Sequence, residues 1–455
     1  MSGDNKMTEE QQGKIIDIRH CCFQSEDSIV INLMSVRRQV NMERFFIKKI
    51  HVDKVRHLVD LDIDISPDSG KMRHLILTGK NGSGKTSLLE ALRIYLNSVS
   101  TSNDPYQTEK DLENDKRNQY AKDTNAAENK IHDNEKRIES YIGIRGKTGL
   151  DLEFSLPQNT IKAEFENGNF ILSSFKAIRS FSSPEPKHIE KTNLKQYYSI
   201  QDNTSSIFLT YLLDLKMTQA LAAAKKDTKK VEEIEIWFNR LQDILRDIYD
   251  DPSLQVIFNE DTFKFSLKIR NREPFDFNTT SDGFSAMLDI IVDLMMRMQQ
   301  QNNRVTEFLM PGIVLIDDVE NQLHLELQRR VLRTLTTLFP NIQFIVSTHS
   351  PFVLNSIENA TIYDLDNKTL IQNGLSDASY SGIVEGYFNQ DELSENLRKK
   401  IEDYRTLTNK DELTDDDYAE LALLETSLDE IPDNIDIGIA TEYKKLKAEF
   451  KRREA

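Results

Sequence analysis

Cysteine is almost absent from this chain, which has 455 residues and only two cysteines. The two, Cys21 and Cys22, are neighbours in the sequence. Adjacent cysteines rarely form a structural disulfide, and they do not match the ligand spacing of a zinc site. We therefore interpret them as ordinary thiols in a reducing compartment, and we expect neither a disulfide framework nor a cysteine-bound metal.

Long apolar runs and a surplus of positive charge are also missing. No run is long enough to span a membrane, and the first residues (MSGDNKMTEEQQGK) lack the apolar core of a signal peptide. The formal net charge of −17 argues against a protein that coats nucleic acid by itself, although it leaves room for local basic patches. These features predict a cytoplasmic protein without a membrane partner.

One glycine-rich stretch, 75–96 (LILTGKNGSGKTSLLEALRIYL), lies between an apolar run and a helical pattern. It fits G-x-x-x-x-G-K-[ST], whose backbone N–H groups cradle phosphate oxygens at a helix N-terminus. The lysine adds a full positive charge, and the threonine hydroxyl is a ligand for Mg²⁺. A chance glycine loop explains the order of strand, loop and helix less well, so we predict that the chain binds ATP and Mg²⁺. The expected nucleotide-binding residues are Gly79, Asn81, Gly82, Ser83, Gly84, Lys85, Thr86 and Ser87, and Thr86 is also an expected metal ligand.

Hydrophobic patterns predict elements on both sides of this loop. Before it, Val59 and Leu61 alternate with aspartates, which indicates a half-solvated antiparallel strand paired with residues 46–55. Within 204–250, apolar residues at helical spacing indicate a helical hairpin with an exposed, charged tip, and Trp237 belongs to its core. Further strands are expected at 150–156, 160–166, 169–175 and 263–269.

Two segments give no sign of chemistry. The stretch 101–130 has no Val, Ile, Phe, Met or Trp, so it cannot bury enough apolar area to offset its ordering entropy. We expect a solvated helix or a mobile polar insertion over 101–140, and we interpret 1–41 as an N-terminal extension.

A second chemical signal is the apolar run 312–316, which leads directly into Asp317 and Asp318. P-loop NTPases hold Mg²⁺ with a carboxylate at the end of such a strand. A helix cap after a strand is the alternative, but it leaves the buried run unexplained. We therefore predict Asp317 as a metal ligand.

Two further segments complete the pattern. The apolar run 342–347 is followed closely by His349, at the carboxyl edge of the sheet, where ligands bind in open α/β folds. A lone histidine is usually structural, but this position favours a sensor of the γ-phosphate. Ser281 and Gly283 precede an amphipathic helix, where a hydroxyl and a glycine form an anion site, although S-D-G is also an ordinary helix cap.

This order of motifs resembles the ABC-type ATPases of the SMC, RecF and OLD group, as do IDDVENQLH (316–324) and STHSPFVLNS (347–356). The resemblance implies an α/β fold of the P-loop NTPase, ABC-ATPase type, with a helical insertion and a helical C-terminal extension. In that group two heads enclose two ATP molecules, so a homodimer or higher oligomer is implied. Ser281 and Gly283 would then contact the γ-phosphate in trans, and His349 would sense it.

More narrowly, SDGFSAMLDIIVDL, the region around THSPFVLNS and the tail SYSGIVEGYFNQDELSENLRKKIEDY resemble the PtuA family of ATPases, over about 44–405. These ATPases serve Septu-type bacterial anti-phage systems and occur with some retrons. The resemblance implies control of a separate HNH nuclease subunit, with DNA reached through the complex. No H-N-H or P-D-ExK cluster is found in the chain, so we expect no nuclease activity of its own.

The sequence departs from the wider group at the expected general base. Where that group has glutamate, this chain has Asp318, whose side chain is one methylene shorter. A base must lie within about 2.6–3.2 Å of the proton that it takes. Either Glu320 takes over this role or hydrolysis is slow, and we favour slow hydrolysis. Asp282 replaces the usual second glycine, and Gln158 is a weakly supported candidate for the Q-loop glutamine.

The residues after 390 read as a helical module with an acidic block and a basic end. Leu397, Ile401 and Tyr404 form one apolar stripe, and Tyr418, Leu421 and Leu424 form another. Opposite charges on one module suit protein docking, and a solvated helical hairpin is an equally good interpretation. We expect three regions: 1–41, an ATPase domain over 42–390, and a partner or oligomerisation module over 391–455. The alternative function is a RecF-like DNA-repair ATPase without a nuclease partner.

Overall fold

The computed structural model describes residues 45–66, 71–100, 145–299, 308–372, 374–375, 395–410, 413–429 and 437–454. The cysteine pair, the N-terminal extension 1–41 and the polar insertion 101–140 lie outside the described residues. The chain divides into two compact units between Asp377 and Ala378, which is earlier than the expected boundary after 390. Each unit is described by itself.

A three-stranded antiparallel sheet precedes and flanks the phosphate-binding loop. It consists of β1 (Ile47–Val55), β2 (Leu58–Asp64) and β4 (Leu150–Phe154), in the order β2-β1-β4. The predicted pairing of β1 and β2 is confirmed, with Val52 opposite Leu61. Val59 was expected on the buried face but is 50% exposed. The cause is Asp60, whose φ of 50° changes the phase of the alternation.

The larger sheet has six strands in the order β11-β10-β3-β9-β8-β5. All neighbouring pairs are parallel except β10 and β11, and the central strands are buried along their whole length. Parallel strands of this kind read as continuous apolar runs, so 312–316 and 342–347 were predicted correctly. The strands are β3 (His74–Thr78), β5 (Ile171–Phe175), β8 (Gly312–Ile316), β9 (Ile342–Ser347), β10 (Ala360–Asp364) and β11 (Thr369–Ile371).

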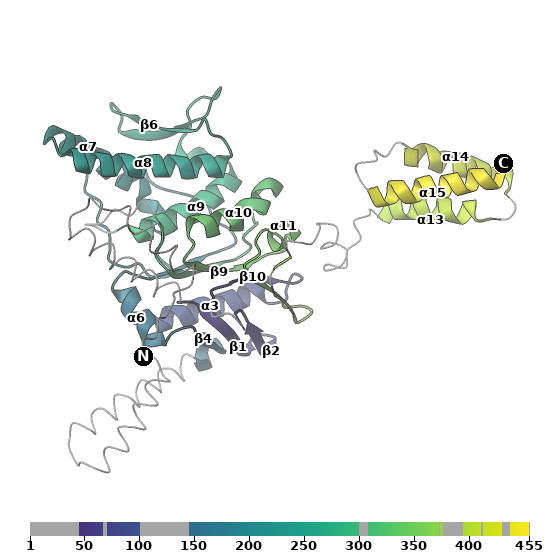
Figure 1. Ribbon diagram of the computed structural model, residues 1–455, viewed down its shortest axis with the longest axis horizontal. Helices are drawn as coiled ribbons and strands as arrows, with labels where there is room; N and C mark the ends of the chain where they lie inside the picture. The colour runs from purple at the N-terminus through teal and green to yellow at the C-terminus, as the bar shows by residue number, and fades with distance from the viewer. Residues whose placement is uncertain are drawn as a thin grey trace, which may run out of the picture. The chain divides into compact units, whose positions relative to one another are not determined.

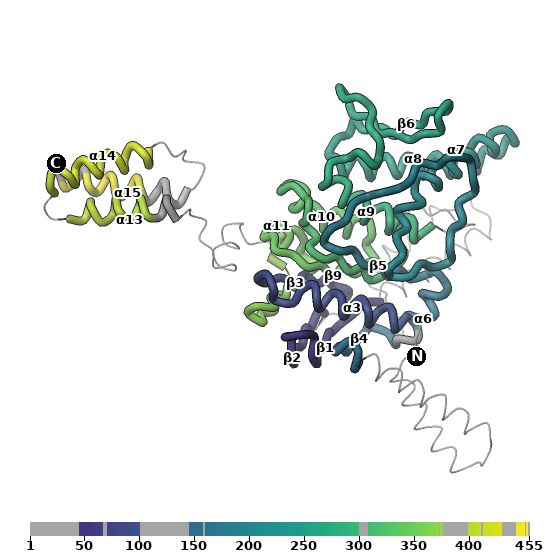
Figure 2. The backbone as a smooth tube through the Cα atoms, turned by 180° about the vertical axis from the view of Figure 1, so that it is seen from behind, coloured from purple at the N-terminus to yellow at the C-terminus, as the bar shows by residue number. Residues whose placement is uncertain are grey.

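Helices cover both faces of this sheet. Figure 1 shows α3 (Lys85–Val99) on one side, and α9 (Asp282–Met298) and α10 (Leu325–Leu338) on the other. The short α11 (Pro351–Leu354) follows β9. Viewed from behind in Figure 2, α3 runs beside the three-stranded sheet, against which it packs. The core of this unit is therefore built where α3 and the two sheets meet.

The prediction of a strand at 160–166 is wrong. It belongs to the helix α6 (Gln158–Glu166), in which Ile161 and Phe165 are both buried. Their spacing of four residues places them on one helical face, where Phe165 packs on Tyr197 with ring centroids 5.3 Å apart.

The predicted helical hairpin is present as α7 (Phe208–Ala224) and α8 (Thr228–Tyr249), with exposed lysines at its tip. Trp237 is a core residue, as expected, and lies edge-on to Tyr211 at 5.4 Å. Beyond the hairpin, β6 (Gln255–Asn259) and β7 (Lys264–Lys268) pair in an antiparallel ribbon. Among the described residues, one stretch, Ser205–Ala224, matches a membrane span in length and composition, but α7 packs on α8 like a core helix.

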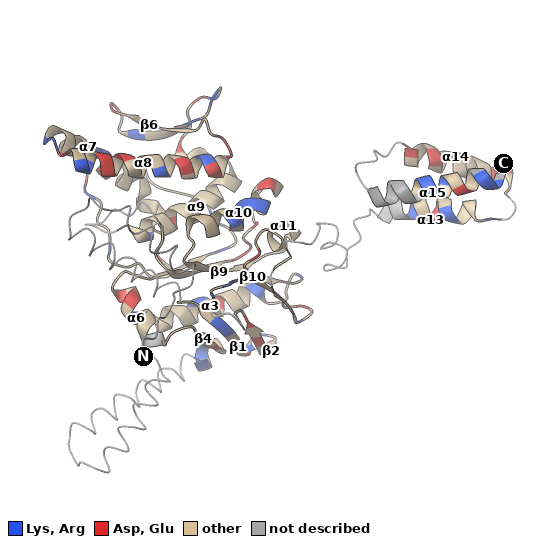
Figure 3. Ribbon diagram, viewed as in Figure 1, with Lys and Arg blue, Asp and Glu red and all other residues tan. Residues whose placement is uncertain are grey.

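The second unit contains α13 (Glu395–Thr408), α14 (Asp415–Asp429) and α15 (Ile437–Glu454). Its core includes Ile401 and Leu421, whereas Tyr418 is 46% exposed and does not belong to a buried stripe. The buried face of α14 instead repeats after seven residues, from Leu421 to Leu428. Figure 3 marks acidic residues at the start of α14 and basic residues along α15, as the sequence predicts.

Candidate active site

The glycine-rich loop joins β3 to α3 and depends on a backbone that only glycine adopts readily. Gly79, Gly82 and Gly84 have φ values of 130°, 83° and 102°. Space is restricted as well, because a Cβ on Gly79 would lie 2.9 Å from Ser83 Oγ. The loop is therefore fixed both by its conformation and by close packing.

Lys85 is the first residue of α3, and its ammonium group reaches back over the loop. Its Nζ donates to the carbonyl oxygens of Gly79 at 2.8 Å and Lys80 at 3.1 Å. Burial lowers the pKa of Lys85, and the nearby carboxylates of Asp318 and Glu320 oppose this shift. The positive charge is thus held where the loop and the helix N-terminus already attract phosphate.

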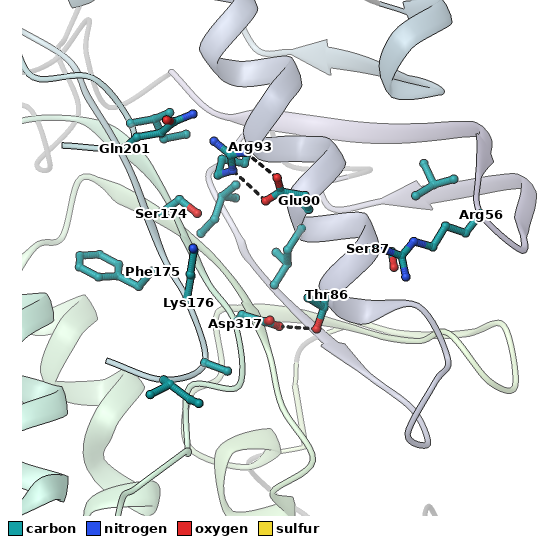
Figure 4. Close-up of a pocket in the computed structure, with 16 residues that line it drawn as sticks. Arg56, Thr86, Ser87, Glu90, Arg93, Ser174, Phe175, Lys176, Gln201 and Asp317 are labelled. Carbon is teal, nitrogen blue, oxygen red and sulfur yellow. Dashed lines mark hydrogen bonds and ion pairs between the residues drawn. The ribbon is translucent and has the colours of Figure 1, made fainter. Parts of the chain in front are cut away.

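Asp317, directly after β8, meets the loop across the sheet edge. Thr86 Oγ1 donates to its Oδ1 at 3.2 Å (Figure 4). Two neighbouring ligands of an octahedral Mg²⁺, each at 2.0–2.1 Å, lie about 2.9 Å apart. The hydroxyl and the carboxylate are therefore of the right chemistry and close to the right separation to hold Mg²⁺ together.

Ser347, the last residue of β9, lies between the two acids and was not singled out by the sequence. Its Oγ donates to Asp317 Oδ1 at 2.6 Å and accepts the backbone N–H of Asp318 at 2.7 Å. The available signal was its position, since it ends the buried strand between the loop strand and the acidic strand. Ser347 orients the carboxylate that faces Thr86.

The other predicted catalytic groups come together on the same edge. Glu320 Oε1 accepts the backbone N–H of His349 at 2.5 Å. This bond joins the acidic turn, residues 317–320, to the end of β9. Glu320 Oε2 is buried and has no hydrogen-bond partner in the described part of the chain. Asp318 lies between Asp317 and Glu320 in the acidic turn. Its φ of 42° is a strained backbone conformation for a residue that has a side chain. The geometry leaves both Asp318 and Glu320 as candidates for the general base.

A cleft of about 860 Å³ opens beside these groups. It is lined by Thr86, Ser87 and Asp317, and also by Arg56 from the β1–β2 turn and Lys176 after β5 (Figure 4). Its volume is within the range of pockets that enclose molecules of the size of ATP. Gln158, the candidate Q-loop residue, is the first residue of α6, and its side chain lies outside the described part of the structure.

Three further loop residues, Asn81, Gly82 and Ser83, border a different hollow of about 380 Å³ together with His57. His57 Nε2 is 3.1 Å from the carbonyl oxygen of Ser83, so the β1–β2 turn supports the loop. The predicted nucleotide-binding residues therefore divide between two sides of the loop.

Ser281 and Gly283 lie at the start of α9, outside the hydrogen bonds described above. Ser281 is exposed and makes no side-chain cap bond. Gly283 is buried, and a Cβ there would lie 2.8 Å from the carbonyl oxygen of Gln322, just after the acidic turn. Close packing thus explains the glycine, while a contact of either residue with ATP in trans stays a prediction.

A sequence profile of the family described as "AAA domain, putative AbiEii toxin, Type IV TA system" matches residues 75–355. The match begins at the loop strand and ends after THSPFVLN, so it includes every group of the edge just described. The chain belongs to this AAA-domain family. It is a P-loop ATPase in family and in fold.

Curated relatives of this AAA-domain protein carry retron and Septu names. "Retron Ec83 probable ATPase" of Escherichia coli is 32% identical over 146 residues, 31% of this chain and 27% of the relative. "Septu protein PtuA" of Bacillus mycoides (strain KBAB4) is 24% identical over 321 residues, 69% of this chain and 39% of the relative. The chain thus matches less than half the length of these relatives, and the resemblance to Septu PtuA is confirmed.

A crystal structure of the SmcHead bound to the C-winged helix domain of ScpA aligns with a TM-score of 0.37 and 13% identity, over 73% of this chain and all of that one.

An Asp318→Glu variant of the AAA-domain protein is expected to turn over ATP about tenfold faster than the wild type, because the added methylene carries the carboxylate closer to the attacking water. The same variant should lose about 1 kcal/mol of stability, since glutamate tolerates the positive φ less well than aspartate. Steady-state phosphate release and thermal melts measure the two effects. If Asp318→Glu and Asp318→Asn both keep the wild-type rate, Glu320 is the base.

Proposed function

We propose that this protein binds ATP with Mg²⁺, hydrolyses it slowly, and uses its nucleotide state to control a separate HNH nuclease in cytoplasmic anti-phage defence. The observation that carries the ATPase part is the 3.2 Å contact between Thr86 Oγ1 and Asp317 Oδ1 at the mouth of the phosphate loop. The defence part is supported by the relatives named for Septu and retron systems.

In this proposal the chain's own groups do most of the work by positioning. Lys85 and the loop N–H groups hold the β- and γ-phosphates, and Thr86 and Asp317 hold Mg²⁺. The metal supplies positive charge to the phosphate oxygens. Asp318 or Glu320 orients the attacking water, and His349 reports whether the γ-phosphate is present.

We further propose that a second copy completes the site, with Ser281 and Gly283 of one head facing the ATP of the other. The exposed position of Ser281 supports this arrangement. We assign 42–390 to the ATPase domain and 391–455 to a module for partners or oligomerisation. The separate three-helix core and the opposite charges of α14 and α15 support the second assignment, and DNA would be reached through the complex.

A Lys85→Ala variant tests the nucleotide control. The protein is assembled with an HNH nuclease of the proposed partner class, and DNA cleavage is measured with and without ATP. We expect ATP to restrain cleavage by the wild-type complex, and we expect the variant complex to cleave equally with and without ATP, because the loop can no longer hold the phosphates.

Equal ATP dependence of the wild-type and variant complexes would contradict the proposal. ATP-dependent DNA binding by the protein alone, with no effect on any nuclease, would instead favour the DNA-repair ATPase. A Lys264→Ala variant is a matched control for charge, because Lys264 lies on β7, pairs with Glu185 at 2.6 Å and does not line the cleft.

A further inference from the structure

The helix α9 carries a row of polar residues on an otherwise apolar, buried surface. They recur every four residues, so each lies beside the next in a row that winds slowly around the helix. The members after the exposed first residue are each at most 6% exposed. Buried polar groups are costly unless they are hydrogen bonded, so this row marks specific contacts. The row is Ser281, Ser285, Asp289, Asp293 and Arg297.

Near the start of α9 the row contacts the segment that follows β5. Ser285 Oγ accepts the backbone N–H of Phe181 at 3.0 Å and lies 3.1 Å from Ser180 Oγ. The Ser285 carbonyl accepts the same N–H at 3.3 Å. The first turn of α9 is thereby fastened to residues 180–181.

Arg179 directly precedes Ser180 and Phe181 in the sequence, and its side chain binds the acidic turn. Its guanidinium donates to three consecutive carbonyl oxygens: Asp317 at 3.1 Å, Asp318 at 3.3 Å and Val319 at 2.7 Å. Arg179 is only 6% exposed, and its Nε has no partner among the described residues. Burial acts to lower the pKa of Arg179, and Glu320 and Asp289 are foremost among the acids that oppose the shift.

The turn that Arg179 holds is strained at Asp318. A φ of 42° costs on the order of 1 kcal/mol or more in a residue with a side chain, and it persists only where the surroundings impose it. Here Arg179 binds the carbonyl groups of the turn, while Ser347 Oγ binds the N–H of Asp318 at 2.7 Å. The position of the Asp318 carboxylate thus depends on Arg179.

A second contact joins the start of α9 to the acidic turn. The tight approach of Gly283 to the carbonyl oxygen of Gln322 brings the first turn of α9 against the end of the acidic turn. None of the hydrogen bonds of Arg179 in the described part of the chain goes to the phosphate loop. These contacts therefore connect α9 to the turn that carries Asp317 and Asp318 and do not involve the phosphate loop.

We propose that Arg179 is a positioning residue that transmits the position of the start of α9 to Asp318. A contact made at Ser281 by a second copy then sets the geometry of the acidic turn through Ser285, Phe181 and Arg179. This inference rests on the proposed ATPase function, and it separates the control of turnover from the binding of ATP.

Arg179→Lys keeps the charge but loses the planar fork that spans the three carbonyl groups. We expect kcat for ATP to fall about tenfold while KM changes less than twofold, because misplacing the acids slows the chemical step without touching the loop. Arg297→Lys is the matched control. Arg297 is also buried and binds carbonyl oxygens, including Leu172 at 3.1 Å, but it lies at the other end of α9. It should lower the melting temperature and leave kcat unchanged.

Hydrogen exchange of the full-length protein without nucleotide tests the transmission even where turnover is slow. Ser285→Ala removes a contact of α9 and touches no acid, yet we expect it to speed exchange of the amides of 317–321 severalfold and leave those of 80–86 unchanged. Arg179→Lys should do the same. Unchanged exchange at 317–321 in Ser285→Ala would overturn the inference. Wild-type protein that neither binds nor hydrolyses ATP would instead refute the proposed function, and exchange would still decide the link.

Discussion

An Asp317→Asn variant is expected to turn over ATP at least about 100-fold more slowly than the wild-type protein. Asparagine keeps the shape of the side chain, and its Oδ1 can still accept the bonds that Thr86 and Ser347 donate at 3.2 Å and 2.6 Å. The change therefore removes a negative charge with little change in packing. Without that charge Mg²⁺ is held weakly, and the phosphate oxygens lose the cation that stabilises the transition state.

Phosphate release measured across a series of Mg²⁺ concentrations would show the effect, with a higher Mg²⁺ requirement in the variant. Asp366→Asn is a suitable control, because Asp366 pairs with Lys80 at 3.2 Å near the loop but has no hydrogen bond to Thr86. A variant at position 317 with the wild-type rate and the wild-type Mg²⁺ requirement would mean that another acid holds the metal.

Acid is expected to destabilise the ATPase unit through His74, by about 3 kcal/mol at pH 4 relative to neutral pH. His74 begins the loop strand β3 and is 5% exposed, and its Nδ1 accepts the backbone N–H of Phe344 at 3.1 Å. Burial lowers its pKa from 6.5 to about 4. As the pH falls below 6.5 the unfolded chain therefore takes up a proton that the folded chain resists, and stability is lost until the pH approaches 4.

Chemical denaturation of the wild type and of His74→Asn at pH 7 and pH 4 isolates this contribution. Asparagine offers an oxygen acceptor near the place of Nδ1 and does not titrate in this range, so the pH dependence of the variant should be smaller by about 3 kcal/mol. Other acids titrate in both proteins and cancel in the comparison. Equal pH dependence in the two proteins would show that His74 is not a source of acid sensitivity.

Four strands of the large sheet, β3, β5, β8 and β9, and both residues of the metal site were predictable from the sequence. A buried parallel strand leaves a continuous apolar run, and the residue after it must lie at the carboxyl edge of the sheet. This is why Thr86 and Asp317 could be paired across 231 positions of sequence before any coordinates. The segment 160–166 could not be assigned in this way, because two buried residues four apart fit a helix and a short strand nearly equally.

Arg179 and Ser347 show why part of the site could not be read from the sequence. Arg179 binds backbone carbonyl groups 138 to 140 residues away. Because every residue type has such a carbonyl group, no particular residue in the sequence indicates this contact. Ser347 acts on Asp317 and Asp318, which follow the neighbouring strand β8 and are about 30 residues away in the sequence. Gly283 was noticed as a possible anion site, whereas the structure gives it a packing role beside Gln322.

The long separation of Thr86 and Asp317 has a consequence for how such a protein can diversify. The stretch between them begins after β3 and ends with β8, two buried strands on either side of β9, so both residues are held at the same edge of the sheet. Doubling the length of a closed loop costs only about 0.6 kcal/mol. Exposed places in this stretch, such as the tip of the α7–α8 hairpin, can therefore lengthen or shorten to suit new partners, while the hydroxyl and the carboxylate that face the metal stay where they are.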